Sequence, residues 1–213
     1  MRVLIIANAP GNLAISDIGY DEIIALDGAV NKLSVSAIIP DYIVGDMDAA
    51  PQEIVESLVA QGSHVIKVDD QNSTDMDKGI NYAGELGATR IDIVNALSGR
   101  MDHTLYNVRI LKKYYSNKRR IIIHEQDELL EYYADCELKV EGKIDSPLAI
   151  MSAPDVTVDS KGLKYDMDGL KLVYGARESS CNSLAAQHAE IRLRGGAIII
   201  YDKTTSLVKR QTS

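Results

Sequence analysis

Two aspartates, Asp46 and Asp48, stand one residue apart directly after Gly45 and the short apolar run of residues 42–44. Such a run is typical of a buried strand in a parallel sheet, and ligands collect at the carboxyl ends of these strands. Two carboxylates there suit Mg²⁺, which takes oxygen ligands and is usually shared between carboxylates and phosphates. Gly and Asp are also common turn residues, so this pair by itself favours a solvated turn.

Three further aspartates follow apolar runs in the first half of the chain, namely Asp27, Asp75 and Asp102. The carboxyl ends of parallel strands share one edge of a sheet, so residues far apart in sequence are expected to converge there. Separate loops or helix caps would explain each aspartate one at a time, and Asp75 suits the first turn of a helix. Carboxylates gathered in one crevice repel one another, so a converged set usually needs a cation.

Lys78 lies one helical turn after Asp75. On a solvated helix face the two would form an ion pair worth a few tenths of a kcal/mol. In a phosphate site Thr74 and the helix N-terminus would face the phosphate, and Lys78 would act as a point charge on it.

A second candidate segment runs from Ser98 to His103. The Ser98-Gly99 pair would let the backbone approach a ligand closely, and Arg100 has the planar fork that suits a phosphate. Asp102 and His103 open a predicted helix. Taken alone, Asp102 would be explained as a helix cap and His103 as a solvated residue at the start of the helix.

The composition excludes several classes of protein. The chain has 213 residues and a net charge of −8, so nucleic acid is not the expected partner. No segment approaches the roughly 20 apolar residues of a membrane helix. Neither GxxxxGK[ST] nor GxGxxG is present, which argues against P-loop kinases and dinucleotide oxidoreductases. Cys136 and Cys181 form no metal-type cluster, so a reducing compartment is the simpler assumption. Together with the lack of a membrane helix, this leads us to expect a soluble, cytoplasmic protein without a membrane partner.

The first half alternates strand-like and helix-like segments. Strands are predicted at residues 3–7, 23–26, 42–44, 64–68, 91–94 and 119–124, with helices near 29–33, 51–60, 74–87 and 102–115. This alternation predicts an α/β fold, a parallel sheet with helices on both faces in a three-layer arrangement.

The second half changes character. Short strand-like segments are predicted at 137–140, 148–152, 156–158, 170–174, 190–193 and 197–201, separated by turn signals that include Pro154 and Gly195-Gly196. Strands at this spacing favour an all-β sandwich or barrel. We therefore expect two domains, residues 1–127 and 128–213, with the boundary near 126–131. The tail, residues 203–213, is polar and predicted to be frayed.

Taken together, these segments resemble the thiamine pyrophosphokinase family. The family pattern reads DGGA, PD-x-x-x-GDFDS, DQ followed by TD-x-x-K, and GGR-x-DH-x-L-x-N, and this chain matches it in order and spacing. The matching residues are Asp27-Gly28-Ala29, Pro40-Asp41, Gly45 to Ala49, Gln71, Thr74-Asp75, Lys78, Gly99-Arg100, Asp102-His103, Leu105 and Asn107. In the second half, residues 162–165 and 179–182 resemble the family's GLKW/GLKY and STSN segments. The chain departs from the family pattern at Ala29, Ala49, Ser98 and Cys181. We expect these departures to affect affinity or substrate detail more than activity.

The resemblance implies an ATP-binding α/β catalytic domain and a β-sandwich domain for thiamine binding and dimerisation. It implies transfer of diphosphate from ATP to the hydroxyl of thiamine, giving thiamine diphosphate and AMP, with Mg²⁺, by a homodimer whose active site lies at the subunit interface. Asp46, Asp48 and Asp75 would bind the metal with support from Asp27. ATP would be held by Asp27, Thr74, Lys78, Arg100 and His103, and thiamine by Gln71, Asp102, Tyr165 and Asn182. Asp46, Asp48, Asp75, Arg100 and Asp102 would be the catalytic residues.

Two other functions remain open at this point. A Mg²⁺-dependent nucleotidyltransferase or glycosyltransferase also uses an Asp-x-Asp pair, although Arg100 and Asp102-His103 argue against it. A non-catalytic regulator that binds thiamine or a nucleotide would be expected to lack Asp46, Asp48 or Lys78, and all three are present.

Overall fold

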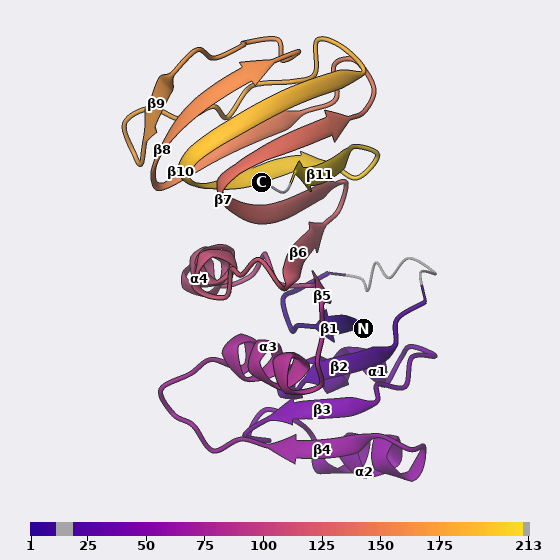
Figure 1. The fold of residues 1–213 in the computed structure, drawn as a ribbon. Helices are drawn as coiled ribbons and strands as arrows, with labels where there is room; N and C mark the ends of the chain where they lie inside the picture. The colour runs from indigo at the N-terminus through magenta and orange to yellow at the C-terminus, as the bar shows by residue number, and fades with distance from the viewer. Residues whose placement is uncertain (12–18, 211–213) are drawn as a thin grey trace. The chain divides into compact units, whose positions relative to one another are not determined.

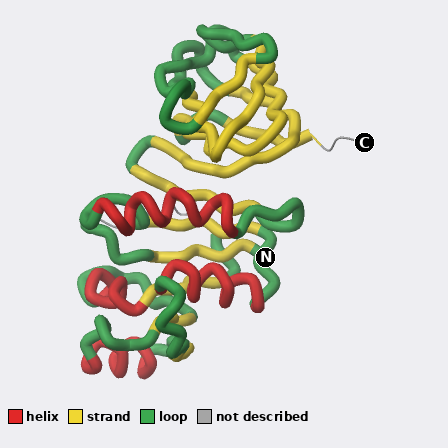
Figure 2. The backbone as a smooth tube through the Cα atoms, turned by 90° about the vertical axis from the view of Figure 1, so that its left-hand side faces the viewer, coloured by secondary structure: helices red, strands yellow, loops and turns green. Residues whose placement is uncertain are grey.

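The computed structural model describes residues 1–11 and 19–210. The chain divides into two compact units, residues 1–126 and 127–213. In Figure 2 all the helices of the described residues lie in the first unit, while the second consists of strands and loops.

The first unit contains a parallel sheet of six strands in the order β4-β3-β2-β1-β5-β6 (Figure 1). All five neighbouring pairs run parallel. The central strands are almost wholly buried, which explains why their sequences read as continuous apolar runs. The bounds are β1 Arg2–Ile6, β2 Glu22–Leu26, β3 Tyr42–Gly45, β4 His64–Lys67, β5 Arg90–Val94 and β6 Arg120–Glu125.

Helices cover both faces of this sheet. Residues of α1 and α2 pack in one cluster with Leu4 and Ile6 of β1. Successive residues of a strand point to opposite faces. An added Cβ at Gly79 of α3 would meet Ile5 and Leu26, so α3 covers the other face. The helices are η1 Asp27–Ala29, α1 Val30–Leu33, α2 Gln52–Ala60, α3 Asp75–Glu85 and α4 Met101–Lys113. The predicted mixed α/β fold is therefore confirmed.

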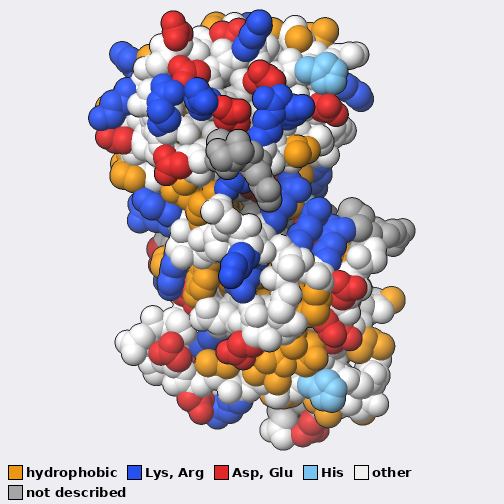
Figure 3. Space-filling view, viewed as in Figure 1, with side chains coloured by type: hydrophobic (Ala, Val, Ile, Leu, Met, Phe, Trp, Pro, Cys, Tyr) orange, Lys and Arg blue, Asp and Glu red, His pale blue; other side chains and the backbone are white. Residues whose placement is uncertain are grey.

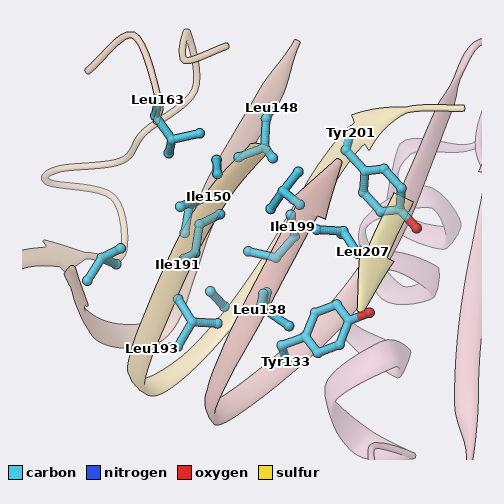
Figure 4. Packing of buried hydrophobic residues seen from close by; sticks show 14 of the residues in the cluster. Tyr133, Leu138, Leu148, Ile150, Leu163, Ile191, Leu193, Ile199, Tyr201 and Leu207 are labelled. Atoms are coloured by element: carbon cyan, nitrogen blue, oxygen red, sulfur yellow. The ribbon is translucent and has the colours of Figure 1, made fainter. Parts of the chain in front are cut away.

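The second unit contains five antiparallel strands paired in the order β9-β8-β10-β7-β11. Its core is a cluster of aliphatic side chains with Tyr133 and Tyr201 at one side (Figure 4). The other face carries cross-strand ion pairs such as Arg192–Glu137 and Arg194–Asp159. Basic and acidic side chains accordingly lie side by side over this unit in Figure 3. The bounds are β7 Glu128–Glu141, β8 Leu148–Lys161, β9 Leu170–Val173, β10 His188–Asp202 and β11 Ser206–Arg210.

The strand pattern predicted for the second half was wrong in three places. Pro154 and Gly195-Gly196 do not end strands, because they lie inside β8 and β10. The register between β10 and β8 shifts after Gly195, whose φ is +100° and whose added Cβ would lie 2.5 Å from the carbonyl oxygen of Asp155. A glycine inside a strand commonly marks such a bulge.

The third correction concerns the C-terminal end of this unit. At its other end, the two units divide between residues 126 and 127, and β7 begins at Glu128. The tail expected to be frayed contains β11, which pairs with β7 from Ser206↔Glu141 to Arg210↔Glu137. Residues 211–213 lie outside the described residues. Across the described residues, no helix has the length and apolar character that a membrane crossing requires.

Candidate active site

Asp27 is the buried base of the acidic cluster. It directly follows β2, and its side chain has no exposed surface. Its Oδ2 accepts a 3.0 Å hydrogen bond from the backbone N–H of Met47. Its Oδ1 is buried and has no hydrogen-bond partner among the described residues. A buried carboxylate oxygen without a partner is costly, so this oxygen is suited to bind a cation.

The turn after β3 brings Asp46 and Asp48 to Asp27. Met47, between them, has a φ of +70°, a left-handed conformation that is uncommon for a residue with a side chain. The hydrogen bond to Asp27 and the packing of the Met47 side chain against the core offset this strain. Carboxylate oxygens of Asp27, Asp46 and Asp48 all lie within 4.8 Å of one another. The structure thus brings together three of the four predicted metal ligands.

Lys78 links this cluster to the fourth predicted ligand. Its Nζ lies 3.0 Å from Oδ2 of Asp46 and 3.1 Å from Oδ1 of Asp75. The Lys78 side chain is only 3 % exposed, which excludes the solvated ion pair that its spacing alone would allow. Asp75 and Lys78 come from the first turn of α3, and Asp46 follows β3, so the two elements present one combined charged surface.

The charges in the cluster shift one another's pKa values. The hydrogen bond from Lys78 lowers the pKa of Asp46 to about 2. The neighbouring Asp46 carboxylate raises the pKa of Asp48. Burial, followed by the charge of Asp75, raises the pKa of Asp27. Burial opposes the charge on Lys78, but its hydrogen bonds to Asp46 and Asp75 outweigh burial and raise its pKa. The site therefore has excess negative charge around a single internal cation.

Thr74 caps α3 together with Asp77. The Thr74 hydroxyl accepts from the backbone N–H of Asp77, while the Asp77 carboxylate accepts from the backbone N–H of Thr74. This capping box occupies the Thr74 side chain. Asp77 is fully buried and was not among the predicted site residues. The T-x-x-D spacing was a signal of the cap, although it did not reveal the contacts of Asp77 with α4.

Arg100 and Asp102 form an exposed fork at the start of α4. Arg100 Nε lies 3.1 Å from Oδ1 of Asp102, and Nη2 lies 2.6 Å from Oδ2. This pairing lowers the pKa of Asp102 to about 2 and raises that of Arg100. The backbone N–H of His103 donates to Asp102, and the His103 side chain is exposed. Both charged groups of the fork are open to solvent, with 73 % and 63 % of their side chains exposed.

The remaining predicted residues lie in two other places. Gln71 is exposed in the turn between β4 and α3. In the second unit, the Asn182 side chain accepts from the backbone N–H of Tyr165 at 3.0 Å and donates to its carbonyl at 2.9 Å. Asn182 is buried, whereas Tyr165 is 59 % exposed. Both line a pocket of about 280 Å³ that also contains Arg177, Glu178 and Cys181. Asn182 therefore holds the loop that presents the Tyr165 ring.

Known proteins with similar sequences belong to the family that the site residues resemble. The model of the family described as "Thiamin pyrophosphokinase, catalytic domain" matches residues 19–123. Thiamine pyrophosphokinase 1 of Oryza sativa subsp. japonica is 27% identical over 71% of this chain and 62% of its own length. Thiamine pyrophosphokinase 2 of Arabidopsis thaliana is 29% identical over 67% of this chain and 58% of its own. The chain thus spans about three-fifths of the length of these plant relatives.

The same fold occurs in solved structures. The crystal structure of thiamine pyrophosphokinase from Bacillus subtilis superposes with a TM-score of 0.80 at 22% identity, covering 95% of this chain and 99% of that one. At this identity the superposition shows a shared fold. The likeness to the family rests on the sequence match, which includes the segments that contribute Asp27, Asp46, Asp48, Asp75, Lys78, Arg100 and Asp102. Residues 19–123 are therefore similar to the catalytic domain of the thiamine pyrophosphokinase family.

Proposed function

We propose that the chain transfers diphosphate from ATP to the hydroxyl of thiamine, giving thiamine diphosphate and AMP. The observation that carries this proposal is the group of three carboxylates, Asp27, Asp46 and Asp48, whose oxygens lie within 4.8 Å of one another. Similarity to the thiamine pyrophosphokinase family supplies the reaction, and the cluster supports the need for a metal.

The cluster suits Mg²⁺. Its donors are carboxylate oxygens, the ligands this ion prefers, and the buried Oδ1 of Asp27 has no partner among the described residues. Asp46 and Asp48 would hold the ion from the exposed side, with Asp75 completing the set. Mg²⁺ bound there would neutralise charge on the phosphate oxygens. Lys78 already balances part of the negative charge of Asp46 and Asp75.

The other residues position the two substrates. The thiamine hydroxyl attacks the β-phosphorus, the bond from that phosphorus to the oxygen of AMP breaks, and the proton of the hydroxyl passes to solvent water. Arg100 and Lys78 would hold the phosphates, with Thr74 and His103 beside them. Asp102 has a pKa of about 2, so it is ionised at neutral pH and is a weak base. We therefore assign Asp102 to orienting the hydroxyl.

We assign ATP binding and catalysis to residues 1–127, in a three-layer domain. Residues 128–213 would be a β-sandwich for thiamine binding and dimerisation. Gln71 and the exposed Tyr165 ring would face the thiamine, because an aromatic face attracts a cationic heterocycle. We further propose that the chain forms a homodimer, which light scattering would test, and that it works in the cytoplasm, where its two free thiols would stay reduced.

The deciding experiment follows AMP, ADP and thiamine diphosphate after the protein is mixed with Mg·ATP and thiamine. We expect AMP and thiamine diphosphate in equal amounts. Formation of ADP would indicate transfer of a single phosphate, and binding of a nucleotide sugar without turnover would favour the transferase alternative. Either result would overturn the proposal.

A variant pair tests the metal ligands in the same assay. Asp46→Asn removes one ligand charge and should lower turnover on the order of 100-fold. The matched control is Asp69→Asn, which removes an exposed carboxylate that is paired with Lys67 and lies outside the cluster. This control should keep its activity. Unchanged turnover of Asp46→Asn at saturating Mg²⁺ would remove Asp46 from the metal site.

A further inference from the structure

Asp77 occupies the junction between α3 and α4. Its Oδ2 accepts from the backbone N–H of Thr74 at 3.1 Å, from the Thr74 hydroxyl at 3.0 Å and from the Tyr106 hydroxyl at 2.8 Å. Its Oδ1 accepts from Nζ of Lys113 at 2.7 Å and from the Tyr114 hydroxyl at 2.9 Å. One buried carboxylate therefore joins the first turn of α3 to three side chains of α4 or its C-terminal end.

The first half of α4 has few other attachments. Between residues 101 and 109 no side chain is buried, and the buried residues of the helix are Ile110 and Leu111, near its other end. Tyr106 is bonded to Asp77, the Asn107 side chain donates to the carbonyl of Ala96 at 2.7 Å, and Thr104 Oγ1 accepts from the backbone N–H of Ser98 at 3.2 Å. Because no side chain of this half is buried, we expect polar contacts such as these to hold the start of α4 in place.

The first turn of α3 and the start of α4 carry the proposed phosphate-binding groups, and Tyr106 is the α4 partner of Asp77 that lies nearest to that start. Asp75 and Lys78 belong to the same turn of α3 as Asp77. Asp102 lies four residues before Tyr106, so the two share one face of α4, and Arg100 is bonded to Asp102. A shift of Tyr106 relative to Asp77 would move Arg100 and Asp102 relative to Lys78.

We propose that Asp77 is a positioning residue that aligns the Arg100–Asp102 fork of α4 with Lys78 and Asp75 of α3. The proposal rests on the proposed function, in which these groups hold the phosphates and the thiamine hydroxyl. Asp77 touches neither substrate. Its effect on catalysis is indirect, because a displacement of about 1 Å at a reacting group can lower a rate 100-fold.

The test compares Asp77→Asn with Asp92→Asn. Asp92 is an equally buried aspartate of the same unit, and its side chain is bonded to Arg2, Arg90 and His124, none of which belongs to α3 or α4. Both variants should unfold at lower temperature than the natural protein. Only Asp77→Asn should lower kcat/KM for Mg·ATP, by about tenfold and mainly through kcat.

Hydrogen exchange provides a measurement that does not depend on activity. In Asp77→Asn, the amides of residues 101–109 should exchange about tenfold faster while those at 79–85 in α3 remain protected. Asp92→Asn should leave this ratio unchanged. Tyr106→Phe removes one of the five bonds and keeps the capping box, so it should shift both readouts in the same direction by less. It also provides the test if Asp77→Asn does not fold.

The outcomes separate the two proposals. If Asp77→Asn is merely less stable, with unchanged kcat, KM and exchange at 101–109, the positioning role is overturned. If the natural protein makes no thiamine diphosphate but exchange at 101–109 still rises selectively in Asp77→Asn, the proposed function fails while the attachment of α4 through Asp77 stands.

Discussion

Gly45 leaves no room for a side chain beneath Asp27, and this makes Gly45→Ala an informative change. The added Cβ would lie 2.6 Å from Cβ of Asp27 and 2.9 Å from its Cγ. Carbon atoms in contact are normally about 3.5–4.0 Å apart, so the Asp27 side chain would have to move by about 1 Å. Asp27 is fully buried, and the blocked atoms include its Cβ, which cannot swing away on a flexible chain.

Two opposing effects set the size of the loss. Gly45 has no positive φ, so alanine brings no backbone strain there. Alanine also restricts the unfolded chain, which should stabilise the folded protein by about 0.4–1 kcal/mol. Overpacking of a buried site costs about 1–3 kcal/mol, which exceeds that gain. We expect a net loss of about 1–2 kcal/mol, or roughly 3–6 °C in Tm for a chain of this length. Because Asp27 is displaced, Mg²⁺ should also raise the Tm less than it does in the natural protein.

The assay is thermal unfolding followed by circular dichroism, with and without Mg²⁺. Gly19→Ala is the control, because its added Cβ meets nothing within 4 Å and its φ is not positive. It should unfold at or slightly above the natural Tm and respond normally to Mg²⁺. The reasoning is refuted if Gly45→Ala is as stable as Gly19→Ala and gains as much from Mg²⁺.

Three further predictions concern charged and polar contacts. Burial opposes the charge of Asp92, but hydrogen bonds from His124, Arg90 and Arg2 outweigh burial and hold its pKa well below the usual 3.8. Asp92→Asn should therefore lower the free energy of unfolding by about 3 kcal/mol at pH 7, measured by urea unfolding. This loss should shrink as the pH falls below 3.8 toward the pKa of Asp92 in the folded protein. A constant difference from pH 7 to pH 3 would contradict this. Lys78→Met should abolish turnover yet increase the Tm gain from Mg²⁺, because Asp46 and Asp75 would lose their internal cation; an unchanged gain, measured by the same thermal scans, would count against it. Asn182→Ala should raise the KM for thiamine more than it lowers kcat in steady-state assays, because it frees the loop that carries Tyr165, and an unchanged KM would show that this loop does not bind thiamine.

The sequence was most informative where order along the chain determines position. Asp27 and Asp46 follow short apolar runs, and parallel strands bring their carboxyl ends to one edge, so their convergence was predictable. The contacts of Asp77 were not, because they depend on how α4 packs against α3, and Tyr106 is 29 residues away. The local T-x-x-D pattern indicated only the helix cap that Thr74 and Asp77 form.

The strand assignments in the second unit failed for a related reason. Gly195 and Pro154 have the same local preference for turns whether the chain reverses or merely bends, and only the pairing with neighbouring strands distinguishes the two. Pairing of β10 with β7 and β8 resumes on the far side of the bulge, and this keeps both residues inside long strands. The short sequence of β11 likewise gives no local sign of its partner, which is residues 137–141 of β7.

The position of β11 has a consequence for solubility. It covers the backbone N–H and C=O groups of residues 137–141 on the side of β7 away from β10. An uncovered strand edge can pair with another molecule and start intermolecular sheet formation. β11 itself ends in Lys209 and Arg210, and charged residues on an edge strand oppose such pairing. A chain cut before Ser206 would therefore be expected to fail by concentration-dependent aggregation, even where its proposed catalytic residues remain intact.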